Sequence, residues 1–224
     1  MRKALTDAVR EGILARNVAD AATLPRTPYT EMATWDTLSA FLGYVHAHAD
    51  LGTATALHVA ATTGMRRGEV AGLRWDAVDL ERAVLRVVAT RTVVDRQVVS
   101  GEPKTSRSRR TVALDARTVA ALRRWKLAQP PSDLVFGMHP DHLSAAFDAL
   151  QAAAGVPRIR LHDLRHTAAS LMLAAGIPVH VVAVRLGHAT PKITLSVYAH
   201  VLPTQGVEAA DVMGAFGPGS VPAP

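Results

Sequence analysis

The stretch between residues 161 and 201 constrains the fold of this chain most, because helix-starting and helix-ending residues divide it at short intervals. Asp and Thr are typical of a helix start, Pro fits the first turn, and Gly ends a helix in the left-handed conformation. Three short helices are predicted on this basis, opening at Asp163, at Pro178 and at Thr190 with Pro191, and the first two close at Gly176 and Gly187. We therefore expect three helix ends to converge.

The residues at these helix ends form a chemically meaningful set. His162 and Arg165 lie three apart in the first turn of the first helix, so both project to one side near its positive end. His188 follows Gly187 directly, and Tyr198 lies on the third helix. An Arg beside a helix N-terminus suits an oxyanion, above all a phosphate, because its planar fork matches phosphate geometry. A phenol aimed at that phosphate is a candidate nucleophile.

The composition fits a helical protein with a polyanionic partner. Of the 224 residues 49% are hydrophobic but only 4% are aromatic, so the interior must be mostly Ala, Val and Leu, which favours closely packed helices. Lys and Arg total 25 against 19 acidic residues, and the resulting net charge of +6 suits nucleic acid without establishing it. The chain has no Cys, which excludes disulfides, thiolate zinc sites and cysteine nucleophiles.

The sequence shows no targeting or membrane segment. Asp7, Arg10 and Glu11 interrupt the apolar positions near Met1, which is unlike a signal peptide. No run approaches the ~20 apolar residues that a membrane span needs. We expect a cytoplasmic protein without a membrane partner.

Most of the chain is predicted to form one mainly α domain with a small antiparallel β-sheet, over residues 30–216. Besides the three helices above, apolar spacing predicts helices over 34–47, 54–63, 67–73, 115–128 and 141–154, and a weaker one over 204–216. Stretches rich in Val and Thr predict a strand pair within 84–99 and a third strand over 109–114. Residues 1–18 predict a separate helix, 19–29 a linker with two prolines, and 217–224 a disordered tail.

Two further cationic groups stand out upstream of the 161–201 stretch. Arg66 ends a Thr-Gly-Met-Arg turn at the mouth of the helix predicted from residue 67, with Glu69 as its expected structural neighbour. Lys104 lies in the segment SGEPKTSRSRR, at a predicted hairpin tip that could reach a DNA groove. The remaining basic candidates are predicted to contact the DNA backbone, namely Arg67, Arg107, Arg109, Arg110, Arg158 and Arg160.

Together these motifs resemble the tyrosine recombinases, the phage-integrase family. The family's active site combines an Arg in a Thr-Gly-x-Arg turn, a Lys in a β-hairpin, His-x-x-Arg, Leu-Gly-His and a later Tyr. All six positions are filled here, in order and at family-like spacing, by Arg66, Lys104, His162, Arg165, His188 and Tyr198. The resemblance implies the family's catalytic-domain fold and site-specific DNA recombination or integration, in which strands are cleaved and rejoined through a 3'-phosphotyrosyl intermediate.

The resemblance also implies how the phosphate is held and attacked. Arg66 and Arg165 would bind its non-bridging oxygens and favour the more negative transition state, and His188 would donate one more hydrogen bond. The phenol of Tyr198, with an ordinary pKa of about 10, must lose its proton as it attacks, helped by the cationic pocket and by His162 as base.

Three residues complete the implied site. Lys104 would protonate the leaving 5'-oxygen, while Glu69 and His166 would support the site structurally. No cofactor and no metal are implied, because the phosphotyrosyl bond conserves the energy of the phosphodiester and the cationic side chains act where other enzymes use Mg²⁺.

The implied partner is double-stranded DNA, bound by a homotetramer. In the family, an N-terminal helical domain that clamps DNA ends in a helix before a linker to the catalytic domain. Here only residues 1–18 match that helix. We therefore expect an N-terminally truncated form of such a recombinase.

Two other interpretations of the same residues are open at this point. His-Asp-x-x-His, with His162 and His166 one turn apart, is close to a zinc-binding helix pattern, although Arg165 lies beside the supposed cation and no third ligand is evident. The predicted helix pair with its turn at Gly176 also fits a helix-turn-helix DNA-binding regulator without catalysis, which leaves Tyr198 without a role.

Overall fold

The computed structural model describes residues 2–22, 35–102 and 108–198, and the chain divides into two compact units, Met1–Glu31 and Met32–Pro224. No helix among the residues described is long and apolar enough to cross a membrane. The helix and the tail predicted over 204–216 and 217–224 lie outside the described residues. So do Lys104 and Arg107.

The first unit contains a short α-helix, α1 (Arg2–Arg10), and a 3-10 helix, η1 (Val18–Ala21). The helix predicted over residues 1–18 is therefore too long. Gly12 adopts a left-handed φ of 74°, and the backbone N–H groups of Gly12 and Ile13 bond to the carbonyls of Val9 and Ala8, a Schellman-type ending. The predicted linker 19–29 begins within η1, and residues 23–34 are not among those described.

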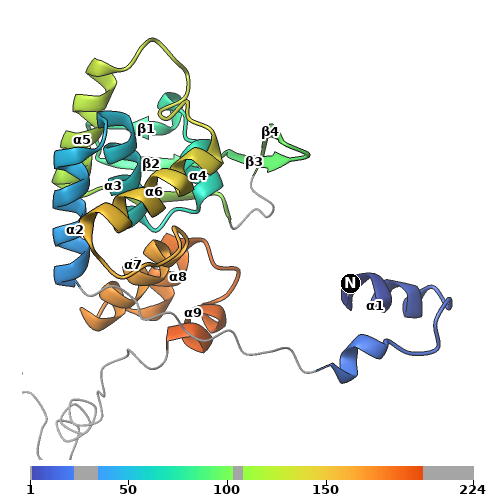
Figure 1. Cartoon of the computed structure of the whole chain (residues 1–224). Helices are drawn as coiled ribbons and strands as arrows, with labels where there is room; N and C mark the ends of the chain where they lie inside the picture. Colours follow the sequence, from blue (N-terminus) through green and yellow to red (C-terminus); the bar gives the residue numbers. More distant parts are fainter. Residues whose placement is uncertain (1, 23–34, 103–107, 199–224) are drawn as a thin grey trace, which may run out of the picture. The chain divides into compact units, whose positions relative to one another are not determined.

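The second unit is mainly helical in its described part (Figure 1). Its α-helices are α2 (Trp35–His48), α3 (Leu51–Thr63), α4 (Arg67–Ala71), α5 (Ala116–Ala128), α6 (Pro140–Ala154), α7 (Asp163–Ala174), α8 (Val179–Leu186) and α9 (Pro191–Tyr198). Polar caps start several of them: Asp50 accepts from a backbone N–H of α3, which therefore begins before the predicted residue 54, and Asp115 caps α5. Gly155 and Gly187 close α6 and α8 in the left-handed conformation, as their positions predict.

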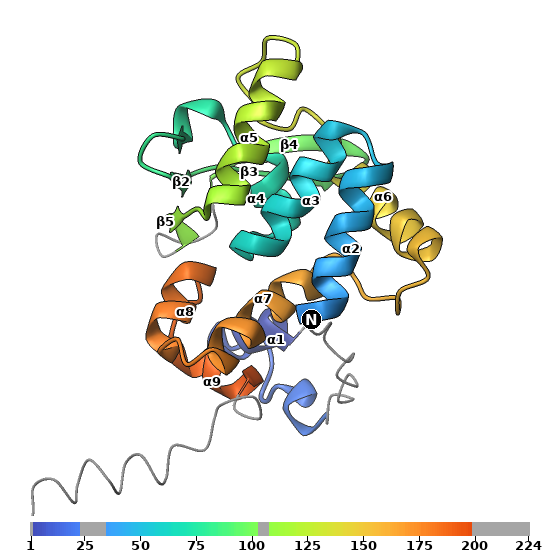
Figure 2. The same cartoon turned by 90° about the vertical axis from the view of Figure 1, so that its left-hand side faces the viewer.

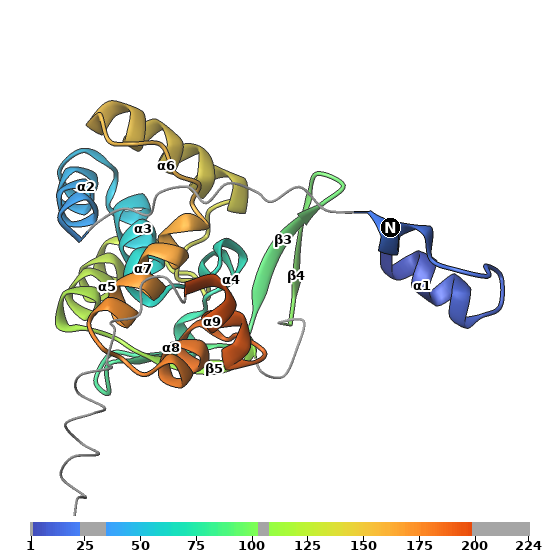
Figure 3. The ribbon, with the colours of Figure 1, turned by 90° about the horizontal axis from the view of Figure 1, so that it is seen from below.

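The predicted strands form two small antiparallel sheets instead of one. After the 3-10 helix η2 (Trp75–Ala77), β1 (Val78–Asp79) pairs with β2 (Val84–Val87), which also pairs with β5 (Arg110–Ala113). The hairpin of β3 (Thr90–Val94) and β4 (Gln97–Gly101) forms the second sheet and extends beside α4 (Figure 3). The segment that contains Lys104 therefore joins strands of two different sheets. The hairpin turn itself is formed by Asp95 and Arg96, both with positive φ.

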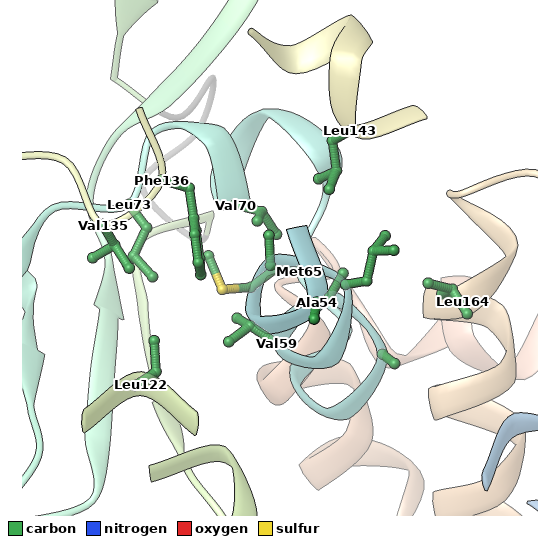
Figure 4. Packing of buried hydrophobic residues seen from close by; sticks show 14 of the residues in the cluster. Ala54, Val59, Met65, Val70, Leu73, Leu122, Val135, Phe136, Leu143 and Leu164 are labelled. Atoms are coloured by element: carbon green, nitrogen blue, oxygen red, sulfur yellow. The ribbon is translucent and has the colours of Figure 1, made fainter. Parts of the chain in front are cut away.

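Helix α3 runs through the centre of the hydrophobic core. Nearly all of its residues are buried, which its small side chains permit because they let neighbouring helices approach closely. Figure 4 shows Val59 of this helix and Met65, which follows it, packed among side chains from other elements, including Phe136 and Val70. The aromatic-poor composition thus corresponds to a core of close helix contacts.

Helices α7, α8 and α9 form a second layer around a smaller core (Figure 2). Five buried side chains make up this cluster: Ala169, Leu173, Val182, Leu186 and Tyr198. Helix α7 also contacts α3, and α8 contacts β5. The predicted three-helix stretch is thereby attached to both the central helix and the sheet.

Candidate active site

Arg66 stands at the start of α4 and is fixed by Glu69. Its backbone N–H donates to Oε2 of Glu69 at 2.9 Å, and its guanidinium donates to Oε1 at 2.8 Å. A Glu at the third helical position reaches back to the helix start in this way, as in a capping box. The Arg66 side chain is 40% exposed, so its guanidinium is anchored within the protein and still accessible to an anion.

Glu69 is in turn held by Arg110, a residue that the sequence pattern assigned to the DNA backbone. That prediction is wrong, because the Arg110 side chain is only 3% exposed and is not available to DNA. It donates instead to both carboxylate oxygens of Glu69, at 3.1 and 2.8 Å. The physical reason is the alternation of β5, which turns Arg110 and Val112 to the buried face. Burial acts to raise the pKa of Glu69, but Arg110 and Arg66 hold it below its usual range.

Arg165 projects from the first turn of α7 into the interior between two turns. Its guanidinium donates to the backbone carbonyl of Gly64 at 2.6 Å and to that of Leu186 at 2.5 Å. Burial lowers its pKa to about 9, with Arg66 adding to the effect, so the group is charged at neutral pH. Arg165 therefore joins the segment before Arg66 to the end of α8.

The turn at Gly187 places His188 near Arg165 and Arg66. The Gly187 φ of 69° favours glycine, and a Cβ there would lie only 3.0 Å from the Arg110 guanidinium. The Gly187 carbonyl accepts a long hydrogen bond from Arg66, at 3.5 Å. Desolvation lowers the pKa of His188 to about 4, and the charges of Arg165 and Arg66 act in the same direction. The imidazole is accordingly neutral at neutral pH.

Tyr198 at the end of α9 is buried against α7 and α8, with 1% of its surface exposed. Its hydroxyl lies 2.6 Å from Nδ1 of His166. Desolvation lowers the pKa of His166, so its neutral ring can accept the phenol proton. His162, the predicted base, lies one turn earlier on α7, with its ring centroid 5.2 Å from that of His166. The imidazole in contact with the phenol is therefore His166.

Comparison with known proteins identifies the family. The sequence pattern described as "Phage integrase family" matches residues 32–205, well over half of the chain. The chain belongs to the phage integrase family. The ICEBs1 integrase of Bacillus subtilis (strain 168) is 30% identical over 94% of the chain, and the XerC-like tyrosine recombinase of Caldanaerobacter subterraneus is 28% identical over 67%.

The fold matches that of solved integrases as well. The Tn1549 transposon integrase, solved in complex with transposon right-end DNA, covers 96% of this chain with a TM-score of 0.79 at 19% identity. The predicted mainly α architecture with a small antiparallel component is thereby confirmed, although its strands form two sheets. The chain spans 62% of the ICEBs1 integrase and 46% of the XerC-like recombinase.

The structure does not support the two other interpretations of the 161–201 stretch, a zinc site and a helix-turn-helix regulator. No cluster of three or more His, Asp or Glu that could hold a metal occurs within the described ranges, and His166 Nδ1 of the supposed zinc pattern faces the hydroxyl of Tyr198. Helices α7 and α8 do form a pair. However, Arg165 of α7 is buried and donates hydrogen bonds to the backbone carbonyls of Gly64 and Leu186. A purely DNA-reading helix pair would leave Tyr198 and this contact unexplained.

Four of the arginines predicted to contact DNA are exposed, and each has an acidic neighbour. Arg67 pairs with Asp141, Arg109 with Glu102, Arg158 with Asp148 and Arg160 with Asp163. The first three pairs are exposed on both sides and are therefore weak, whereas the Asp163 carboxylate is only 5% exposed and also accepts from the backbone N–H of Arg160. The guanidiniums of Arg67, Arg109 and Arg158 can therefore exchange these partners for phosphates.

Sequence reasoning missed two residues that hold the site together. Arg185 of α8 donates to the carbonyls of Ala113 and Thr62, which joins α8 to β5 and α3. Thr194 of α9 lies 2.7 Å from His188. A signal for Thr194 exists in the sequence, because it precedes Tyr198 by four residues and so shares its helix face.

Proposed function

We propose that this chain is the catalytic domain of a site-specific recombinase, which cleaves and rejoins DNA strands through Tyr198. One observation carries the proposal: Arg66, Arg165 and the neutral His188 meet around the turns at Gly64 and Gly187. A phenol in contact with an imidazole lies on the helix that follows. Membership of the phage integrase family supports this assignment.

The two guanidiniums provide the charge for one DNA phosphate. The backbone carbonyls of Gly64 and Leu186 take two of the five N–H donors of Arg165, and the others can serve a ligand. Charge on the non-bridging oxygens increases as the fifth bond to phosphorus forms. Fixed cations in a desolvated site therefore stabilise the transition state more than the bound DNA.

Attack forms a bond between the Tyr198 oxygen and phosphorus and breaks the bond from phosphorus to the 5'-oxygen. We propose that the phenol proton passes to His166, which already contacts the hydroxyl, with His162 as the next imidazole along α7. Since Tyr198 is almost fully buried, DNA binding must move α9 or its surroundings before attack. The product is a 3'-phosphotyrosyl bond and a 5'-hydroxyl.

The leaving 5'-oxygen needs a proton, which we assign to Lys104. Rejoining is the reverse reaction, in which a 5'-hydroxyl attacks the phosphotyrosyl bond and Tyr198 leaves. One phosphoester is exchanged for another in both directions. No nucleotide cofactor is therefore needed to drive either step.

The proposed substrate is double-stranded DNA. Arg67, Arg107, Arg109, Arg158 and Arg160 are its proposed phosphate contacts. Exchange between two duplexes requires four strand cleavages, one for each Tyr198, and so a tetramer on DNA. We also propose that the protein acts in the cytoplasm, as its sequence predicts.

Covalent capture of DNA tests the function even while the target sequence is unidentified. Incubation with a library of nicked duplexes is expected to give a protein–DNA adduct that is stable in SDS and absent in Tyr198→Phe. Tyr44→Phe is the matched control, because Tyr44 stacks on His48 in α2, away from the site residues. Sequencing the captured DNA identifies the target. An adduct that persists in Tyr198→Phe, or DNA binding without any adduct, contradicts the proposal.

A further inference from the structure

Thr194 is a buried polar residue to which the proposed reaction assigns no role. It lies in α9 with 0% of its surface exposed, and its Oγ1 is 2.7 Å from Nδ1 of His188. No other side-chain hydrogen bond of Thr194 occurs within the described part of the chain. The hydroxyl and the imidazole are therefore each other's defined partners.

Because Thr194 has this one side-chain partner, the direction of its hydrogen bond with His188 can be inferred. A threonine hydroxyl carries one proton and needs an acceptor for it, and the acceptor at hand is Nδ1 of His188. In the opposite arrangement Nδ1 would carry a proton and donate it to Oγ1. The hydroxyl proton would then be buried without a partner, which is unfavourable. The contact therefore favours a His188 whose proton is on Nε2.

The tautomer matters because His188 is neutral under ordinary conditions. Its environment, with Arg165 and Arg66 nearby, lowers its pKa to about 4. A neutral imidazole has one N–H, so the same ring is a donor at one nitrogen and an acceptor at the other. Only the tautomer with the proton on Nε2 can donate from that nitrogen to a phosphate oxygen.

We infer that Thr194 is a positioning residue, which holds His188 in the tautomer and orientation that donate from Nε2 to the DNA phosphate. The inference rests on the proposed function, within which it assigns a task to a residue outside the six motif positions. Partners of this kind that orient a ligand imidazole typically change activity 10- to 100-fold when removed, as known from metal sites.

The position of Thr194 on α9 couples the placement of Tyr198 to the tautomer of His188. Thr194 and Tyr198 are four residues apart, so they lie on one face of the helix, and both are buried. Docking of α9 therefore delivers the nucleophile and sets the tautomer of His188 in the same event. A site from which α9 has been withdrawn loses both.

The test compares Thr194→Val, which removes the hydroxyl and keeps the shape, with Thr194→Ser, which keeps the hydroxyl. The first readout is the ¹⁵N chemical shifts of the His188 ring in the free protein, assigned by their loss in His188→Gln. The second is the rate of Tyr198 adduct formation. We expect Nε2–H in the wild type, a mixed or reversed tautomer with cleavage at least about tenfold slower in Thr194→Val, and recovery of both in Thr194→Ser.

Either of two results overturns the inference: an unchanged His188 tautomer in Thr194→Val, or cleavage that Thr194→Ser does not recover. Thr194→Ala, which only removes atoms, provides the same comparison should the valine variant not fold. A wild-type protein that forms no adduct contradicts the proposed function instead. The chemical shifts are measured without DNA, so the two failures are distinguishable.

Discussion

Arg110 and Glu69 form an ion pair whose side chains are only 3% and 4% exposed, with Nη2 and Oε2 2.8 Å apart. The carboxylate is shared, because Glu69 also accepts from the backbone and the guanidinium of Arg66. Arg110 also donates to the carbonyl of Arg185 in α8. The Glu69 carboxylate thus joins β5 to the start of α4, and Arg110 joins both to the end of α8. These three elements meet where the proposed phosphate would bind.

Removal of Arg110 should destabilise the fold. Arg110→Ala leaves the carboxylate of Glu69 buried with one cation fewer, and breaking a buried pair typically costs about 3–5 kcal/mol. Urea unfolding measures this loss. Arg109→Ala is the matched control, because its side chain is 52% exposed and should change stability by no more than about 0.5 kcal/mol. Equal stability losses in the two variants would contradict the structural role of Arg110.

Arg109, in contrast to the buried Arg110, should affect DNA binding and not stability. Each phosphate contact contributes about −0.9 to the slope of log K against log salt. Arg109→Ala should therefore make the slope shallower by about that amount if this residue contacts phosphate. A slope unchanged in Arg109→Ala would remove Arg109 from the proposed contacts.

The residue that accepts the proton of Tyr198 can be identified from the pH dependence of cleavage. His166 lies 2.6 Å from the phenol oxygen, so His166→Ala should slow adduct formation by roughly 10²–10⁴. The deficit should shrink as the pH rises toward about 10, where the phenol ionises by itself. The comparison variant is His162→Ala, whose deficit should not shrink in this way. The reverse pattern would assign the proton to His162.

Acid should weaken the folded domain through its neutral histidines. The pKa values of His162 and His188 are lowered from 6.5 to about 4, mainly by desolvation. Between these values the unfolded chain binds protons that the folded chain does not, so the free energy of unfolding falls as the pH falls from about 6.5 to 4. Urea unfolding at several pH values measures the slope. His188→Gln should flatten it, and a slope unaffected by this variant would count against the assignment.

How far the sequence alone predicts the site depends on the kind of interaction. Local signals were sufficient for several helix ends, because Gly187 and Asp115 act within their own turn, but not for the start of α3 or the end of α1. The burial of Arg110 was also predictable in principle. It lies two residues before Val112 on β5, and alternation puts both on the face toward the core.

Contacts between elements could not be derived in this way. His162 and His166 share a helix face, and only the packing of α9 on α7 decides which of them meets Tyr198. The two carbonyls that hold Arg165 come from residues 64 and 186, far apart in the sequence. The six motif residues, with Glu69 and His166 as supports, were thus predicted from the resemblance to the family, whereas the roles of Arg110, Arg185 and Thr194 depend on tertiary packing.

Lys104 lies outside the described residues, and the chemistry of the leaving group assigns it the role of general acid. With Arg66, Arg165 and His188 on the non-bridging oxygens, the bridging 5'-oxygen is the atom that still needs a donor as its bond to phosphorus breaks. An ordinary arginine has a pKa above about 12, and even the buried Arg165, with a pKa lowered to about 9, keeps its proton at neutral pH. Nearby cations, by contrast, lower the pKa of a lysine toward neutrality. Lys104→Ala should therefore slow cleavage by roughly 10²–10⁴.

A substrate with sulfur at the bridging 5'-position separates acid catalysis from phosphate binding. Sulfur leaves as a thiolate, which needs no proton, so this substrate should restore most of the rate lost in Lys104→Ala. It should not restore the rate lost in Arg165→Ala, because that variant lacks charge on the non-bridging oxygens. The two rates of adduct formation are compared on matched oxygen and sulfur substrates. Rescue of both variants, or of neither, would show that Lys104 binds phosphate without donating the proton.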